Sequence, residues 1–259
     1  MKVMSFSREM EAMRRIAAQA GALLLRYAEQ GVTAEEKLDD SPVTIADKES
    51  EKLIVSALTM EFPGDGLLGE EGANKASTNG RKWIIDPLDG TRDFVRGNGL
   101  WAVLMALEVD GDVKAGICHF PVLRRTYTAI KGRGAYCNDL PIRVSAITDI
   151  SKAVLCANSL QKANQFAWGK GLVEWMGQFW AVRSQGGGPD CMMLISGQSD
   201  AWLEPTSQPW DLAPLKVLIE EAGGKFFNMD GGNSIYAGNC LACTPALEPE
   251  MRRYFVEQT

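Results

Sequence analysis

Hydrophobic positions along the chain follow two periods, one typical of helices and one typical of strands. From Arg8 to Gln30, apolar residues recur every three or four positions, which predicts a long helix that ends at Gly31. A second helix is expected from Asp47 to Phe62, since Pro63 and Gly64 stop it. Helical patterns later in the chain cover 168–179, 192–195, 210–222 and 247–258.

Short apolar runs bounded by glycine, proline and aspartate predict the strands. Two of these runs, 100–109 and 113–120, are joined by Asp110-Gly111-Asp112, which is a hairpin signal. Further strands are expected at 126–131, 142–144, 153–157, 201–203, 225–228 and 236–244. A polar loop is expected at 37–41, and no repeat or long linker interrupts the pattern.

The stretch WIIDPLDGT, from 83 to 91, combines a buried strand with a cluster of oxygen ligands. The apolar run 83–85 predicts the strand, and Pro87, which lacks an N–H, is expected to turn the chain there. Asp86, the Leu88 carbonyl, Asp89 and Thr91 then offer, within six residues, the oxygen ligands that Mg²⁺ prefers. The same residues also fit an ordinary aspartate-rich turn that only caps a strand.

Three other stretches carry candidate chemistry with equally simple structural alternatives. Thr44 and Asp47 have capping-box spacing, so they either only start a helix or also orient a water. Glu70 and Glu71 are adjacent carboxylates that either face solvent or share a cation. Asp211 lies in the first turn of a predicted helix, where a carboxylate is favoured by the helix dipole alone.

A glycine-rich stretch, RSQGGGPD from 183 to 190, follows a predicted strand. Three successive glycines expose backbone amides and can open the N-terminus of a helix, a place that attracts anions. The simpler alternative is a flexible connection.

Composition narrows the classes of function. The net charge of −6 and the absence of a basic run argue against nucleic acid as a partner. The sequence contains no run of about 18 apolar residues, so no membrane span is expected. The first residues lack the apolar core of a signal peptide, so a cytoplasmic location is expected. Because no secretory signal is found, the six cysteines are expected to be reduced and mostly buried. Cys240 and Cys243 lack the two further soft ligands that a zinc site would need, so a structural role is expected for this pair. His119 is the only histidine, and no nucleophile motif accompanies it.

The acidic motifs together resemble those of the inositol monophosphatase family of Mg²⁺-dependent, Li⁺-sensitive phosphatases. The resemblance rests on TxxD at 44–47, GEE at 69–71, DPLDGT at 86–91, WD at 210–211 and EAGG at 221–224, and it covers nearly the whole chain. It implies an α/β fold, a layered α-β-α-β-α sandwich of the inositol monophosphatase and fructose-1,6-bisphosphatase type. It also implies two halves, 1–145 and 146–259, packed as one compact unit that usually forms a homodimer.

The resemblance further implies a role for each matching residue. One Mg²⁺ would be held by Glu70, Asp86 and the Leu88 carbonyl, and a second by Asp86, Asp89 and Asp211, with a third ion loosely held near Glu70. Two cations about 4 Å apart suit in-line displacement at phosphorus. Thr44, Asp47 and Thr91 match the family's water-orienting group, and the amides of Gly90 and Thr91 match its phosphate cradle.

The substrate is less defined than the chemistry. Glu204 matches a position that accepts hydrogen bonds from substrate hydroxyls, which suits a polyol or amino-alcohol phosphate. The run 93–97 and Trp101 resemble the histidinol-phosphatase branch, whereas Gly187 and its neighbouring glycines suit the inositol branch, because the nearest carboxylate, Asp190, is displaced along the chain. The sequence therefore favours an inositol monophosphate-like substrate, with histidinol phosphate as the alternative. A protein-binding regulator with dispensable catalysis is the alternative of another class.

Overall fold

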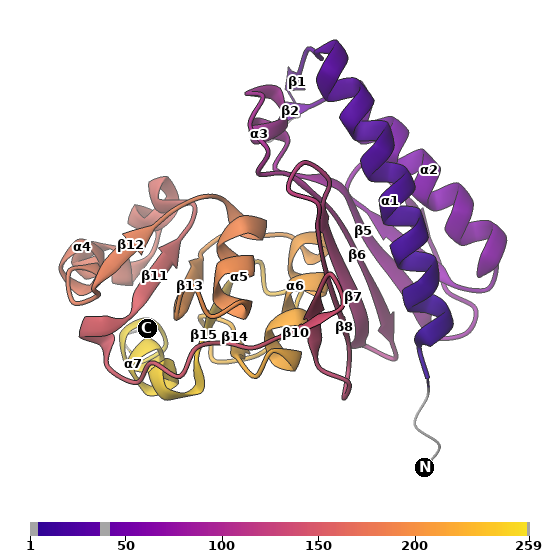
Figure 1. The fold of residues 1–259 in the computed structure, drawn as a ribbon. Helices are drawn as coiled ribbons and strands as arrows, with labels where there is room; N and C mark the ends of the chain where they lie inside the picture. The colour runs from indigo at the N-terminus through magenta and orange to yellow at the C-terminus, as the bar shows by residue number, and fades with distance from the viewer. Residues whose placement is uncertain (1–4, 37–41, 258–259) are drawn as a thin grey trace.

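The protein is a stack of five layers in which helices and sheets alternate (Figure 1). The structure is a computed structural model and describes residues 5–36 and 42–257. Helices α1 (Ser7–Gln30) and α2 (Ile45–Glu61) cover one face of an eight-stranded sheet. Helices α5 (Gly187–Ile195) and α6 (Pro209–Glu221) lie between this sheet and a five-stranded one. Helices α4 (Leu172–Met176) and α7 (Glu248–Phe255) cover the outer face of the second sheet, so the layered sandwich is confirmed.

The larger sheet is mostly antiparallel and has the order β10-β9-β8-β7-β6-β5-β3-β4. Its strands are β3 (Gly66–Gly69), β4 (Asn74–Lys75), β5 (Arg81–Asp89), β6 (Ala102–Val109), β7 (Asp112–Phe120), β8 (Arg125–Ile130), β9 (Ala135–Cys137) and β10 (Leu140–Ile142). The predicted hairpin is β6–β7, and Asp110 and Gly111 at its tip have φ of 51° and 80°, as a two-residue turn between twisted strands requires. Strands β3 and β5 are parallel, which brings their carboxyl ends to one edge.

The smaller sheet has the order β12-β11-β13-β15-β14. Its strands are β11 (Val154–Ala157), β12 (Ala181–Arg183), β13 (Ala201–Glu204), β14 (Lys225–Phe227) and β15 (Cys240–Cys243). A two-stranded pair, β1 (Glu35–Glu36) and β2 (Pro42–Val43), precedes α2. The remaining elements are α3 (Thr91–Val95) and the 3₁₀ turns η1 (Ile150–Lys152), η2 (Leu160–Gln165), η3 (Ala167–Gly171) and η4 (Pro245–Leu247).

Three expectations about strands differ from the structure. Pro87 does not end β5; the ladder to β6 is interrupted between Asp86 and Asp89 and then resumes, because proline cannot donate to it but fits an irregularity. The strand expected at 142–144 ends at Ile142, since the Val144 N–H donates to the Ala222 carbonyl at the end of α6. The strand expected at 236–244 begins only at Cys240, because the chain before it turns around Asn228. The loop expected at 37–41 lies outside the described residues.

Three buried clusters hold the layers together. One lies between α1, α2 and the large sheet, one around α5 and α6, and one between the small sheet and the outer helices. Helix α6 is therefore packed among apolar residues of both sheets, and Asp211 is the acidic residue of its first turn. None of the helices in the described part of the chain is long and apolar enough to span a membrane.

Candidate functional site

The candidate site is a cavity of about 930 Å³ at the edge where β5 and β3 end. The end of β5 and the start of α3 line this cavity, together with the first turns of α5 and α6 and the end of β13. Six carboxylate side chains and two basic ones line the cavity: Glu70, Asp86, Asp89, Asp93, Glu204, Asp211, Arg92 and Lys162. An excess of four negative charges at full ionisation would repel an anionic ligand unless cations intervene.

Three of these carboxylates converge although they are distant in sequence. One oxygen of each of Asp86, Asp89 and Asp211 lies within 4.8 Å of the others. The irregularity at Pro87 places Asp86 and Asp89 at the same edge, and Asp211 reaches them from the first turn of α6. Asp86 is 2% exposed, and Asp89 Oδ2 is buried and has no hydrogen-bond partner among the described residues.

Crowding of these acids changes their protonation. Burial and then the charges of Glu70, Asp89 and Asp211 raise the pKa of Asp86 well above its ordinary value. Burial and the charges of Asp211, Glu70 and Asp93 raise the pKa of Asp89 to about 8. Carboxylates this close are stable together only if some are protonated or a cation lies among them. The partnerless oxygen and the all-oxygen donor set fit a hard divalent cation such as Mg²⁺.

Glu70 belongs to the same group through the register of the large sheet. Gly69 at the end of β3 pairs with Ile85 of β5, and the Glu70 N–H donates to the Ile85 carbonyl at 3.2 Å. The charge of the nearby Glu70 carboxylate contributes to the raised pKa of Asp86. The Leu88 carbonyl lies at the same cavity and accepts the Thr91 hydroxyl at 3.2 Å. All five predicted metal ligands therefore line one cavity.

The predicted water-orienting residues form a chain of hydrogen bonds that ends at the cavity. Asp47 Oδ2 accepts the Thr44 N–H at 2.7 Å and the Thr44 hydroxyl at 2.6 Å, and Thr44 Oγ1 accepts the Ala46 N–H. Asp47 Oδ1 accepts the Thr91 hydroxyl at 3.0 Å. Thr44 and Asp47 are each 1% exposed, so only Thr91 of the three lines the cavity. Gly90, with φ of 85°, turns the chain from β5 into α3.

Glu204 lies at the opposite wall of the cavity. Its Oε2 accepts the Asn158 side-chain amide at 2.8 Å, whereas Oε1 is buried without a partner in the described structure. Burial, together with the charges of Asp211 and Asp89, raises the pKa of Glu204 to about 8. Gly187 lets α5 approach, since a Cβ there would lie 3.3 Å from Glu204 Oε2. Asn158 was not expected from the sequence, because its bond to Glu204 spans 46 residues and no local signal marks it.

Asp190 does not reach the cavity. Its side chain is buried and accepts the Gln185 N–H at 3.0 Å, behind the glycines that line the wall. Burial raises its pKa to about 6. The displaced carboxylate therefore does not stand in for an acidic residue near Gly187.

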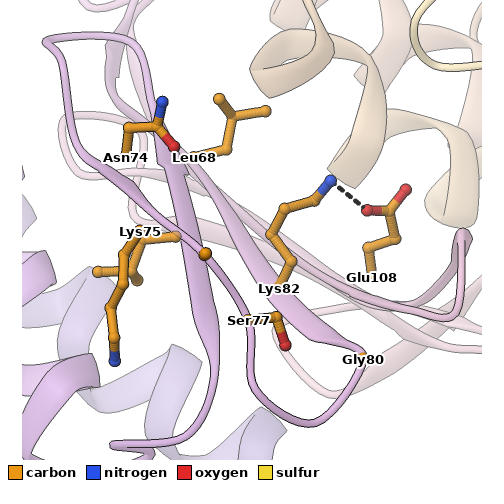
Figure 2. Close-up of a pocket in the computed structure, with 9 residues that line it drawn as sticks. Leu68, Asn74, Lys75, Ser77, Gly80, Lys82 and Glu108 are labelled. Atoms are coloured by element: carbon orange, nitrogen blue, oxygen red, sulfur yellow. Dashed lines mark ion pairs between the residues drawn. The ribbon is translucent and has the colours of Figure 1, made fainter.

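A second cavity, of about 390 Å³, lies beside β4 and β5 and has its charges paired within the protein. Figure 2 shows the Lys82 and Glu108 side chains directed toward each other from neighbouring strands, 2.6 Å apart. The Tyr236 hydroxyl donates to Glu108, and the Lys75 ammonium donates to the Pro63 carbonyl. This cavity consequently offers few groups for a ligand. All six cysteines are free, and five are buried, as expected.

Comparisons with known proteins agree with the geometry. A family model described as the inositol monophosphatase family matches residues 7–258. A histidinol-phosphatase of Chlorobaculum parvum is 38% identical over 87% of this chain and 88% of its own length. An inositol-1-monophosphatase of Rhizobium meliloti is 35% identical over 78% of this chain and 77% of its own length. The crystal structure of the extragenic suppressor protein suhB from Bartonella henselae superposes with a TM-score of 0.88 and 29% identity, covering 96% of this chain and 98% of that one.

Proposed function

Because the chain belongs to the inositol monophosphatase family and is thus a phosphoric monoester hydrolase, we propose that it acts with two or three Mg²⁺ ions on a small alcohol phosphate. The observation that carries the proposal is the convergence of Asp86, Asp89 and Asp211 within 4.8 Å, beside Glu70. Glu70, Asp86 and the Leu88 carbonyl would hold one ion, and Asp86, Asp89 and Asp211 a second. Bound there, the ions would supply a hydroxide at neutral pH and charge stabilisation for the leaving oxygen.

The chain's own residues position the reactants around that chemistry. Thr91 holds its hydroxyl between Asp47 and the Leu88 carbonyl, so we propose that it orients the attacking water from the β5 side. Thr44 fixes Asp47 through two hydrogen bonds and keeps it from turning away. The amide N–H groups of Gly90 and Thr91 would donate hydrogen bonds to the phosphate oxygens at the start of α3.

Glu204 directs the choice of alcohol in this proposal. Its Oε2 accepts a hydrogen bond from Asn158, whereas its buried Oε1 has no donor in the described structure. A substrate hydroxyl or ammonium would supply that donor. An ammonium would also match the acidic lining of the cavity. The 38% identity to a histidinol-phosphatase adds to this argument, so we place histidinol phosphate first and inositol 1-phosphate second.

A phosphate-release panel tests the proposal. The purified protein would be given histidinol phosphate, inositol 1-phosphate, glycerol 2-phosphate, fructose 1,6-bisphosphate and adenosine 3′,5′-bisphosphate with Mg²⁺, with and without Li⁺. We expect the largest kcat/KM for histidinol phosphate, loss of activity with a chelator and inhibition by Li⁺. An equal or greater kcat/KM for inositol 1-phosphate would contradict the preference for histidinol phosphate. No release from any monoester, together with binding of a large partner, would favour the regulatory role instead.

We also propose that the halves 1–145 and 146–259 act as one compact unit in a cytoplasmic homodimer. The family resemblance supports the dimer, and sedimentation of the purified protein would test it.

A further inference from the structure

Helix α2 touches three of the segments that build the cavity. Asp47 accepts the Thr91 hydroxyl, and Ser50, which is fully buried, donates to the Pro87 carbonyl at 3.0 Å. Glu51 follows Asp47 by four residues and therefore lies on the same face of the helix. The contacts of Asp47 and Ser50 reach the β5–α3 segment, whereas those of Glu51 reach the turn that carries Glu70.

The Glu51 carboxylate forms the inner support of that turn. Oε2 accepts the Glu71 N–H at 2.8 Å, and Oε1 accepts the Ala73 N–H, also at 2.8 Å. Glu51 is only 5% exposed, so both bonds are sheltered from water. The turn is closed by the Gly69 N–H, which donates to the Ala73 carbonyl at 2.7 Å. The backbone on both sides of the Glu70 side chain is thus held by hydrogen bonds. The Glu70 N–H donates to the Ile85 carbonyl, and the Glu71 N–H donates to the Glu51 carboxylate.

Gly69 leaves the space that the Glu51 carboxylate occupies beside the turn. A Cβ at this position would lie 2.3 Å from Glu51 Oε2, closer than real atoms approach. Any other residue would push the Glu51 side chain off the two amides. The glycine and the buried glutamate therefore act together, although they lie 18 positions apart in the sequence.

We propose that Glu51 is a positioning residue for the cation that Glu70 helps to hold. By binding the amides on the C-terminal side of Glu70, it fixes the direction in which the Glu70 carboxylate leaves the turn, toward Asp86. This inference rests on the proposed metal site, and it assigns to Glu51 no contact with metal or substrate. Replacing Glu51 should weaken metal binding because the turn loses its support while every ligand remains.

Calorimetric titration of the metal-free protein with MgCl₂ tests the proposal without any substrate. In Glu51→Gln, the side-chain amide can accept only one of the two N–H groups and turns a donor toward the other. We expect the Mg²⁺ dissociation constant to rise about tenfold or more, as is typical when a group that orients a metal ligand is lost. The Glu71 and Ala73 amides should also exchange hydrogen faster in the metal-free state. Raising Mg²⁺ should restore most of kcat, which a general loss of structure would not allow.

Glu49→Gln is the matched control, since it makes the same change on the same helix, where the Glu49 side chain is 42% exposed and forms an ion pair with Lys52. It should bind Mg²⁺ as the wild type does. Gly69→Ala is the second variant, and it should weaken Mg²⁺ binding with Glu51 and Glu70 both intact, so it decides the matter if Glu51→Gln does not fold.

The outcomes separate the two levels of the argument. Wild-type Mg²⁺ affinity in folded Glu51→Gln, or in Gly69→Ala where only that variant folds, would overturn the positioning role and leave the proposed function standing. A lower unfolding temperature with unchanged affinity would have the same meaning, since a structural role alone predicts it. Failure of the wild type itself to bind Mg²⁺ would overturn the proposed function and this inference together.

Discussion

Helices α2 and α6 begin in the same way but serve the cavity differently. Each starts with a capping box whose third residue is an aspartate: Asp47 in α2 and Asp211 in α6. In α2 the carboxylate is buried and accepts hydrogen bonds from Thr44 and Thr91. In α6 the capping bonds from Ser207 and Gln208 fall on Oδ2 alone, and the carboxylate lies in the acidic cluster with Asp86 and Asp89. Asp47 thus holds Thr44 and Thr91 in place, whereas Asp211 adds negative charge to the acidic cluster.

The largest effect should come from removing that charge. Asp211→Asn keeps an oxygen that can accept the Ser207 and Gln208 bonds, so the helix start should survive. We expect phosphate release to fall by about a thousandfold or more, because a proposed metal ligand is lost. Asp86→Asn should do the same. Assays over a Mg²⁺ series, with circular dichroism as the control for folding, check both variants; full activity in them would refute the metal assignment.

Replacing Asp47, which holds Thr91 in place, should reduce activity less than replacing Asp211 and should leave Mg²⁺ binding nearly unchanged. Asp47→Asn keeps one acceptor oxygen for Thr44 or Thr91 but cannot serve both as the carboxylate does. We expect kcat to fall about a hundredfold while the Mg²⁺ dissociation constant stays within about threefold of wild type, since Asp47 does not line the cavity. Steady-state kinetics and calorimetry measure the two quantities separately. A large loss of Mg²⁺ affinity would contradict the division of roles between the two helices.

The caps themselves should differ in what they contribute to stability. Thr44→Ala removes the cap of α2 and one bond to buried Asp47, and it should lower the free energy of unfolding by about 1 to 2 kcal/mol. Ser207→Ala removes one bond to the half-buried Asp211 and should cost about 0.5 kcal/mol. Urea denaturation of the metal-free proteins compares them. Equal losses would show that burial does not distinguish the two caps.

Helix α5 is a third helix that begins beside the cavity. Its aspartate, Asp190, neither caps the helix nor lines the cavity. Burial raises the pKa of Asp190 to about 6, so the folded state holds its proton more tightly than the unfolded chain, whose aspartate pKa is about 3.9. Stability from this group is therefore present at low pH and is lost as pH rises toward and through 6. Asp190→Asn removes this dependence, so the stability of the variant relative to wild type should rise by about 1 kcal/mol from pH 5 to pH 8. Urea denaturation at the two pH values measures the change, and a pH-independent difference would contradict it.

The sequence predicted most of the fold because its long elements carry strong periodicity. Helices α1, α2 and α6 and the β6–β7 hairpin lie close to their expected bounds. Helix α5 was expected only from 192 to 195, since Gly187, Gly188 and Pro189 are poor helix formers; it begins at 187 because its first turns are buried against both sheets. Strands β4, β9 and β12 are two or three residues long and gave no periodic signal.

The candidate site was readable where its residues are close in sequence and only by resemblance where they are not. Asp86, Leu88, Asp89 and Thr91 lie within six residues, so their oxygens could be grouped by inspection. Which of Glu70 and Glu71 faces the cavity depends on the register of β3 with β5, which no local pattern fixes. The supports from Asn158 and Glu51 join segments that are far apart along the chain, so only the folded structure shows them.

The position of α6 between the two sheets has a consequence for protein synthesis. Asp211 comes late in the chain, in a helix whose buried residues pack with residues of both sheets. Asp86 and Asp89 leave the ribosome before Asp211 is synthesised, so the third member of their cluster is absent until then. A nascent chain of this protein would therefore hold all of the proposed metal ligands only in the last part of translation.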